Sequence, residues 1–167
     1  MTIDSVLDAL YQTAIAAEIR ENELAFPWIE TIHVLAITLV VGSIAAVDLR
    51  LLGLASRDRL AARVMSDLLP ITWIAFAFAA ASGALMFISN ATAYSHNAYF
   101  RAKLVLLLLA GCNMAIFQVF VQGRVRATEI GARLPAPARI AALCSLSLWI
   151  LVVAAGRWIG FTMLAGY

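Results

Sequence analysis

The chain has 167 residues, of which 63% are hydrophobic and only 13% are charged. Such a composition excludes a disordered chain and indicates an integral membrane protein. The net charge of +2 is small, and the sequence carries no nucleic-acid-binding signature.

The N-terminal segment is amphipathic. Apolar side chains recur at helical spacing from residue 3 to residue 15, with acidic and amide side chains mostly on the opposite face. This pattern predicts one amphipathic helix over residues 3–21, lying in the outer membrane interface. The acidic start argues against a signal peptide. Pro27 and Trp28 suit the first turn of a membrane helix that begins at the interface.

Four long apolar runs follow, at about residues 27–54, 68–89, 100–122 and 139–164. A membrane span needs roughly 20 mostly apolar residues, so each run is long enough. The connections are short, so neighbouring helices are expected to be antiparallel. The predicted fold is all-α: an integral membrane four-helix bundle with an N-terminal interfacial helix, forming a single domain over residues 1–167.

The basic residues predict the orientation of the bundle. Most arginines lie in the first and third connections, at positions 50, 57, 59, 63, 124, 126, 133 and 139. Cytoplasmic loops carry an excess of Lys and Arg. We therefore expect a bacterial inner-membrane protein with the first and third connections in the cytoplasm and both termini in the periplasm.

Three ionisable residues lie inside the runs instead, at one predicted depth near the outer face: His33, Lys103 and Arg157. His33 is roughly 9 Å beyond Pro27 along a helix. An ionisable residue within a span is a functional-site hypothesis. Lys103 and Arg157 are expected to point into the bundle, although long basic side chains also reach headgroups from the lipid face.

Heme b would use all three groups. Neutral imidazole is an axial ligand of heme iron, and propionates pair with Lys or Arg. The site expected from the sequence therefore has His33 as iron ligand, with Lys103, Arg157 and Arg101 near the propionates. His96, in the second connection, is either a second axial ligand or a solvated loop residue. His33 itself is alternatively a core histidine bonded to a neighbouring carbonyl.

Several motifs resemble known families. The stretch from Trp28 through His33 to Asp48-Leu49-Arg50, together with Phe100-Arg101-Ala102-Lys103, resembles HemJ-type protoporphyrinogen oxidases and copper-resistance protein D-like membrane domains. In the HemJ-type proteins the first-helix histidine binds heme and the lysine that opens the third helix is essential. The resemblance implies those roles for His33 and Lys103.

The sequence is also similar to an uncharacterised family of small bacterial four-helix membrane proteins. The shared pattern includes His33, Asp48-Leu49-Arg50, Lys103, Asn113 and Ala155-Gly156-Arg157. The chain lacks the Asn-Glu-Val-Pro-like segment of the HemJ-type enzymes, and Arg157 stands where they tend to have lysine. These departures argue against protoporphyrinogen oxidation and leave heme binding as the expectation.

Two functions remain open at this point. The first is a heme b-binding membrane redox protein, either an oxidoreductase or an electron-transfer subunit, that exchanges electrons with quinone or a partner subunit. The alternative is a cofactor-free accessory subunit of a larger membrane complex. Both are compatible with a homo- or hetero-oligomer in the lipid bilayer.

Overall fold

The computed structural model of the protein describes residues 3–128 and 132–164, and these residues form helices and no strand. In chain order the elements are α1 (Ile3–Tyr11), α2 (Ala14–Glu21), α3 (Ala25–Leu52), α4 (Ala61–Ser89), α5 (Ala91–His96), α6 (Ala98–Ile116), the π-helical η1 (Phe117–Val121), α7 (Gln122–Arg126) and α8 (Ala136–Leu164). The all-α fold expected from the sequence is confirmed.

Four long helices are apolar enough to cross a membrane: α3, α4, the continuous segment Ala98–Arg126, and α8. The protein is therefore a multi-pass membrane protein whose surface suits a lipid bilayer. The helices extend beyond the apolar runs. The second begins at Ala61 rather than at residue 68, because polar side chains such as Ser66 and Asp67 continue the helix outside its apolar part. Hydropathy locates the apolar core and not the helix ends.

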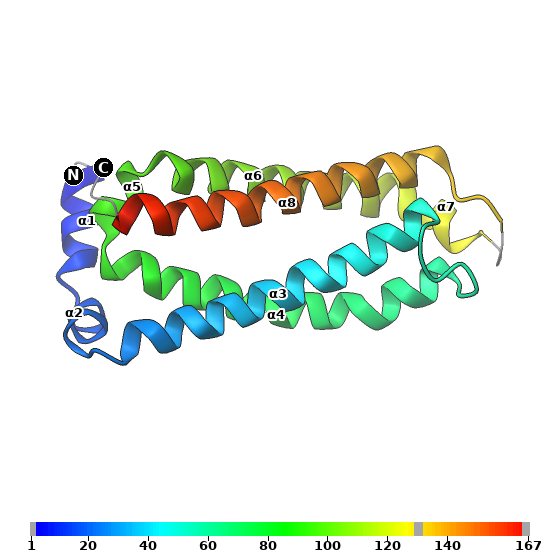
Figure 1. Ribbon diagram of the computed structural model, residues 1–167. Coiled ribbons are helices and arrows are strands. Elements are labelled where there is room, and N and C mark those ends of the chain that lie inside the picture. Colours follow the sequence, from blue (N-terminus) through cyan, green and yellow to red (C-terminus); the bar gives the residue numbers. More distant parts are fainter. Residues whose placement is uncertain (1–2, 129–131, 165–167) are drawn as a thin grey trace.

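The four spans form an incomplete ring (Figure 1). Helix α3 packs along α4 and α8, and α8 packs along α6. Among the described residues α4 and α6 make at most marginal contact with each other. Neighbouring helices run antiparallel, as the short connections predict. The bundle is thus closed on three sides and loosely joined on the fourth.

The two ends of the bundle differ. At one end, here called the terminal end, α3 begins, α8 ends, and α1, α2 and α5 lie across the helices (Figure 1). The opposite end, here called the arginine-rich end, carries the connection at 53–60, the end of α7 and the start of α8. Helix α1 packs on α5, and α2 packs on α3 and α4.

The single helix expected over residues 3–21 is wrong in one respect, because the chain breaks into α1 and α2. Thr13 has an extended backbone, and its hydroxyl accepts a hydrogen bond from the Ala16 amide at 3.3 Å. The same hydroxyl donates to the Leu10 carbonyl at 2.8 Å. Thr13 thereby ends one helix and caps the next. Arg20 fastens this pair to the bundle by donating to the carbonyl of Ser89.

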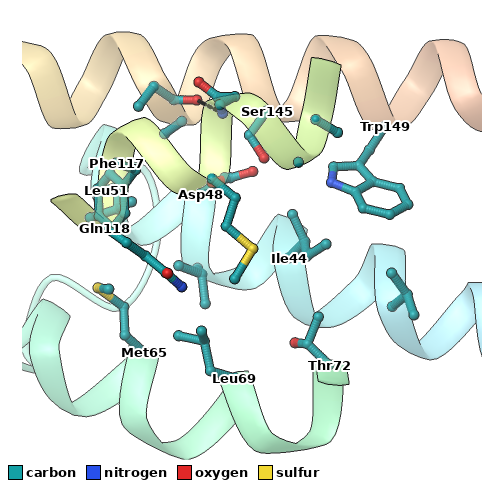
Figure 2. A pocket seen from close by; sticks show the side chains of 18 of the residues that line it. Ile44, Asp48, Leu51, Met65, Leu69, Thr72, Phe117, Gln118, Ser145 and Trp149 are labelled. Atoms are coloured by element: carbon teal, nitrogen blue, oxygen red, sulfur yellow. Dashed lines mark hydrogen bonds between the residues drawn. The ribbon is translucent and has the colours of Figure 1, made fainter. Parts of the chain in front are cut away.

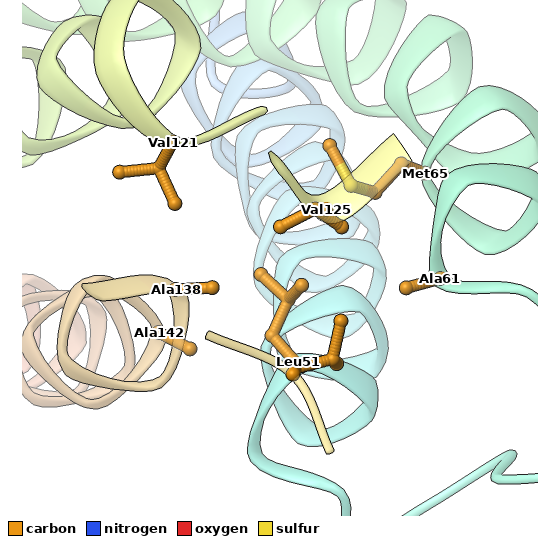
Figure 3. Close-up of a cluster of buried hydrophobic side chains, with 8 residues drawn as sticks. Leu51, Ala61, Met65, Val121, Val125, Ala138 and Ala142 are labelled. Carbon is orange, nitrogen blue, oxygen red and sulfur yellow. The ribbon is translucent and has the colours of Figure 1, made fainter. Parts of the chain in front are cut away.

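A cluster of buried apolar side chains fills the arginine-rich end (Figure 3). It joins α3, α4, η1, α7 and α8 through Leu51, Ala61, Met65, Val121, Val125, Leu134, Ala138 and Ala142. The largest side chains that are fully buried include Val125. This packing joins the ends of these helices at the arginine-rich end.

Candidate functional site

His33 lies between α3 and α4, where Gly83 leaves room for its ring. A Cβ atom at position 83 would stand 3.0 Å from Cε1 of His33, which is closer than ordinary packing allows. Only glycine therefore lets the imidazole approach the α4 backbone without displacement. The absence of a side chain at Gly83 therefore leaves the space in which the His33 ring packs.

Ser82 orients this ring. Nδ1 of His33 lies 3.0 Å from the Ser82 hydroxyl, which itself lies 2.6 Å from the Phe78 carbonyl. A carbonyl only accepts, so the single hydroxyl hydrogen is assigned to that bond, and Nδ1–H of His33 then donates to Ser82. The Ala79 backbone is a further hydrogen-bond partner of this ring. In the assigned tautomer Nε2 carries the lone pair, which is the form of histidine that binds metals.

Lys103 points into the bundle, as expected from the sequence. A Cβ atom at Gly156 of α8 would lie 3.6 Å from the Lys103 ammonium nitrogen, so the amine rests against that helix. Its charge is close enough to act on His33. Among the described residues Lys103 has no hydrogen-bond acceptor and no acidic partner. The cluster of His33, Ser82 and Lys103 thus contains one unpaired, half-buried amine.

Arg157 and Arg101 do not join this cluster. Arg157 is exposed, and its guanidinium lies 4.6 Å from the centre of the Phe161 ring on the same helix. The expected inward orientation is therefore found for Lys103 but not for Arg157. Arg101 is exposed as well. Both remain at the terminal end, where an exposed cation meets water or headgroups.

His96 is exposed on α5 and is held by its own helix. Its Nδ1 lies 2.9 Å from the Thr92 carbonyl and 3.3 Å from the Ser95 hydroxyl. Neither bond links it to His33. Within residues 3–128 and 132–164, no three His, Cys, Asp or Glu side chains converge as a metal-binding group. Heme iron needs only one or two protein ligands, so that finding bears on other metal sites.

An aromatic cluster lies at the terminal end of the bundle. The rings of Phe87 and Phe100 stack at 5.3 Å, and Tyr94 packs against Phe100 at 5.5 Å. Burial raises the pKa of the Tyr94 phenol above its ordinary value, and the nearby carboxylate of Glu30 raises it further. Glu30 is exposed and forms no ion pair with Lys103 or Arg157.

A second polar site lies deeper, in a cavity of about 350 Å³ on the loosely joined side of the bundle (Figure 2). Residues of α3, α4, α6, η1, α7 and α8 line it. We call it the lateral cavity, because α4 and α6, which both line it, make at most marginal contact with each other in the described part of the chain. Most of the lining is apolar, and Trp149 and Met65 are among the side chains that reach it.

Asp48 is the charged residue of the lateral cavity. Its side chain is only 5% exposed, and the oxygen Oδ2 has no hydrogen-bond partner. Ser145 of α8 bonds to the carboxyl group. The carboxyl and Ser145 stand side by side at the cavity in Figure 2. A buried carboxyl oxygen without a partner is rare in native proteins and needs an explanation.

Two amides accompany Asp48. The Asn113 side chain donates to the Ala141 carbonyl at 3.1 Å and so joins α6 to α8. Gln118 lines the cavity but has no hydrogen-bond partner among the described residues. It lies in the π-helical segment η1, and π-helical turns are frequent at functional sites. From the sequence alone, Asn113 is part of a pattern shared with a family of small membrane proteins, and Gln118 carries no signal of its own. The charge of Asp48 inside a helix was the available signal.

Comparison with known proteins identifies a family and no activity. The model of a family of unknown function, DUF6644, matches residues 24–162. Because the match covers most of the chain, the protein belongs to this family. No curated protein and no solved structure matches the chain. The matched part contains both the His33 cluster and the lateral cavity, whereas α1 and α2 lie outside it.

Proposed function

We propose that this member of the DUF6644 family is a heme b-binding membrane electron-transfer protein, with the cofactor at the terminal end of the bundle. The observation that carries the proposal is the hydrogen bond between His33 and Ser82, which leaves Nε2 of a neutral imidazole available as an axial ligand. Metal-bound histidines commonly use their other nitrogen in this way, because the bond fixes the ring.

The unpaired amine of Lys103 supports the same proposal. A half-buried cation without an acid needs an anionic partner, and a heme propionate supplies one. The other propionate would then pair with Arg101 or Arg157, which are exposed at the same end. Bound heme would supply one-electron chemistry. The residues of the chain would orient the ring and hold its carboxylates near the membrane surface.

Absorption spectroscopy tests the proposal directly. The chain is expressed with ample heme supply and purified in detergent, alongside His33→Ala and the matched control His96→Ala. We expect a Soret band that sharpens on reduction in the wild type, is absent in His33→Ala, and is retained in His96→Ala. A shift to a high-spin spectrum in His96→Ala would add that residue as a second ligand. A colourless wild-type protein would refute heme binding and favour the cofactor-free accessory subunit.

A second candidate function rests on the lateral cavity. We propose that it holds a lipophilic carrier of the quinone class. Such a molecule combines an apolar body with carbonyl or hydroxyl groups, and the cavity combines an apolar lining with the free oxygen of Asp48 and the free amide of Gln118. A carboxyl group accepts a hydrogen bond from a quinol, and in its acid form donates one to a quinone. Entry from lipid between α4 and α6 would suit such a ligand.

Fluorescence titration tests this binding. A short-chain quinone is added to the detergent-purified protein, and quenching of Trp149 is assigned with Trp149→Phe. Asp48→Asn should weaken binding about ten- to a hundredfold, since a hydrogen bond to a charged group contributes roughly 1.5–3 kcal/mol. Ser147→Ala is the control, because Ser147 is exposed and bonds only within α8. Equal affinity in Asp48→Asn and Ser147→Ala would contradict the assignment.

The location of the protein in a bacterial inner membrane, with both termini periplasmic, is part of the proposal. The arginines at one end support it. Cysteine labelling tests it after Cys112 and Cys144, the two natural cysteines, are replaced. Glu23→Cys at the terminal end should react with an impermeant reagent outside intact cells. Ser56→Cys should react only after permeabilisation, and the reverse pattern would invert the orientation.

A further inference from the structure

A second cavity, of about 360 Å³, lies at the arginine-rich end and is strongly basic. Arg50 of α3, Arg57 of the following connection, Arg133 and Arg139 all line it, and none of the described residues that line it is acidic. These arginines come from two stretches of the chain that are far apart in sequence, residues 50–57 and 132–139. The fold, rather than the local sequence, brings them to one cavity, which we call the arginine pocket.

Arg50 is the unusual member of this set. Only 5% of the residue is exposed, so most of its side chain is shielded from water and the rest faces the pocket. Its Nε donates to the Arg59 carbonyl at 2.8 Å, which fixes the side chain against the first connection. Its other N–H groups have no acceptor among the described residues. The ion pair found in the same part of the chain joins Arg59 to Asp67 and leaves Arg50 without a carboxylate.

An anion would resolve this arrangement. A buried charge is expensive unless it is paired, and several guanidinium groups around one cavity repel one another. Topology signals do not explain it, because loop arginines can determine orientation while fully exposed to water. The planar guanidinium fork matches the oxygens of a phosphate group in particular. A water molecule takes about 30 Å³ in the liquid, so the pocket has room for a group far larger than one water.

We infer that the arginine pocket binds a phosphate-type anion, with Arg50 as the deep ligand and Arg57, Arg133 and Arg139 as the rim. The pocket lies where α3 ends and α8 begins, at the level at which lipid phosphates border a membrane protein. An anionic lipid headgroup and a free phosphate compound share this chemistry. The inference does not depend on heme binding or on a ligand in the lateral cavity, although Leu51 lines both that cavity and the arginine pocket.

Thermal unfolding of the delipidated protein in detergent distinguishes the two sources. The compounds added in separate measurements are phosphatidylglycerol, cardiolipin, zwitterionic phosphatidylcholine, inorganic phosphate and pyrophosphate. Stabilisation by the anionic lipids alone identifies a headgroup site. Stabilisation by phosphate or pyrophosphate as well identifies a site for free anions. No stabilisation by any anion beyond that of phosphatidylcholine overturns the inference.

Variants locate the site. Arg50→Gln and Arg139→Gln should raise the dissociation constant about ten- to a hundredfold, as expected for the loss of one charge-assisted hydrogen bond. Arg63→Gln is the matched control, because Arg63 is an exposed arginine at the same end that does not line the pocket. If Arg50→Gln fails to fold, Arg133→Gln tests the exposed rim instead. Equal weakening by Arg63→Gln and the pocket variants would reduce the effect to surface charge and overturn the inference.

Discussion

The two ends of the bundle differ in whether their polar side chains have hydrogen-bond partners within the protein. At the terminal end, His33 is bonded to Ser82 and packed on Gly83. Towards the arginine-rich end, and among the described residues, the buried Oδ2 of Asp48 has no hydrogen-bond partner and Arg50 has no carboxylate partner. Roughly 22 Å of helix separates His33 from Asp48. In the first site the protein itself supplies the hydrogen-bond partner, whereas the other two are the sites at which we propose that a ligand supplies it.

This difference separates two kinds of functional evidence. An unsatisfied buried polar group costs about 1–3 kcal/mol, so its presence indicates a role outside stability. A satisfied group such as His33 contributes to packing whether or not it binds a cofactor. Stability should therefore fall when the satisfied groups are removed, and rise when the unsatisfied ones are removed.

The largest effect is expected from the apolar cluster that supports the arginine-rich end. Leu51 is 3% exposed, and Leu51→Ala should destabilise the bundle by about 2–5 kcal/mol through the cavity it leaves. Leu35→Ala is the control, because Leu35 is 61% exposed on the same helix. Thermal unfolding in detergent measures both. Similar midpoints for the two variants would mean that this end is not held by its apolar core.

Gly83→Val tests whether the terminal end depends on the seat of His33. The added side chain would collide with the imidazole and should cost about 1–3 kcal/mol, as overpacking usually does. The proposed heme spectrum should also be lost or altered. Gly42→Val is the control, since a Cβ atom at Gly42 meets nothing within 4 Å. Equal unfolding temperatures and spectra in the two variants would contradict a fitted seat.

The two buried polar groups should respond with opposite signs. Ser82→Ala removes the bond to His33 and should cost about 0.6–1.7 kcal/mol. Asp48→Leu removes an unsatisfied carboxyl oxygen and should stabilise the empty protein by about 1–3 kcal/mol while quinone binding is lost. Unfolding midpoints without and with a short-chain quinone measure both effects. Destabilisation by Asp48→Leu without quinone would show that Asp48 serves the fold.

The smallest effect concerns Tyr94, outside the spans. Its pKa is raised in the folded protein, so the neutral phenol is favoured there. The resulting stabilisation is present below the ordinary pKa of about 10 and is lost as the pH rises through the folded value. Wild type should therefore lose stability above about pH 10 more steeply than Tyr94→Phe. The difference in phenolate absorbance between the two proteins should show that the Tyr94 phenol loses its proton at a higher pH than an ordinary tyrosine. A parallel pH dependence would contradict burial of this phenol.

The number and pairing of the spans could be predicted because they depend on local properties. Twenty or so apolar residues suffice to span a membrane wherever they occur, and short connections leave no alternative to antiparallel neighbours. The amphipathic helical character of residues 3–21 could also be predicted, although the hydroxyl of Thr13 divides the segment into α1 and α2. Lys103 and His33 could be grouped from depth alone.

Which way each side chain faces was decided only by the tertiary structure. The spans are apolar on all sides, so their sequences carry little information on rotation about the helix axis. Lys103 and Arg157 share a depth, yet one turns inward against Gly156 and the other lies outside on Phe161. The lateral cavity exists because α4 and α6 scarcely meet, and the arginine pocket because α3, its connection and the start of α8 converge. The depth of a residue in the membrane follows from counting residues along a helix. The direction in which its side chain points depends on which helices pack together.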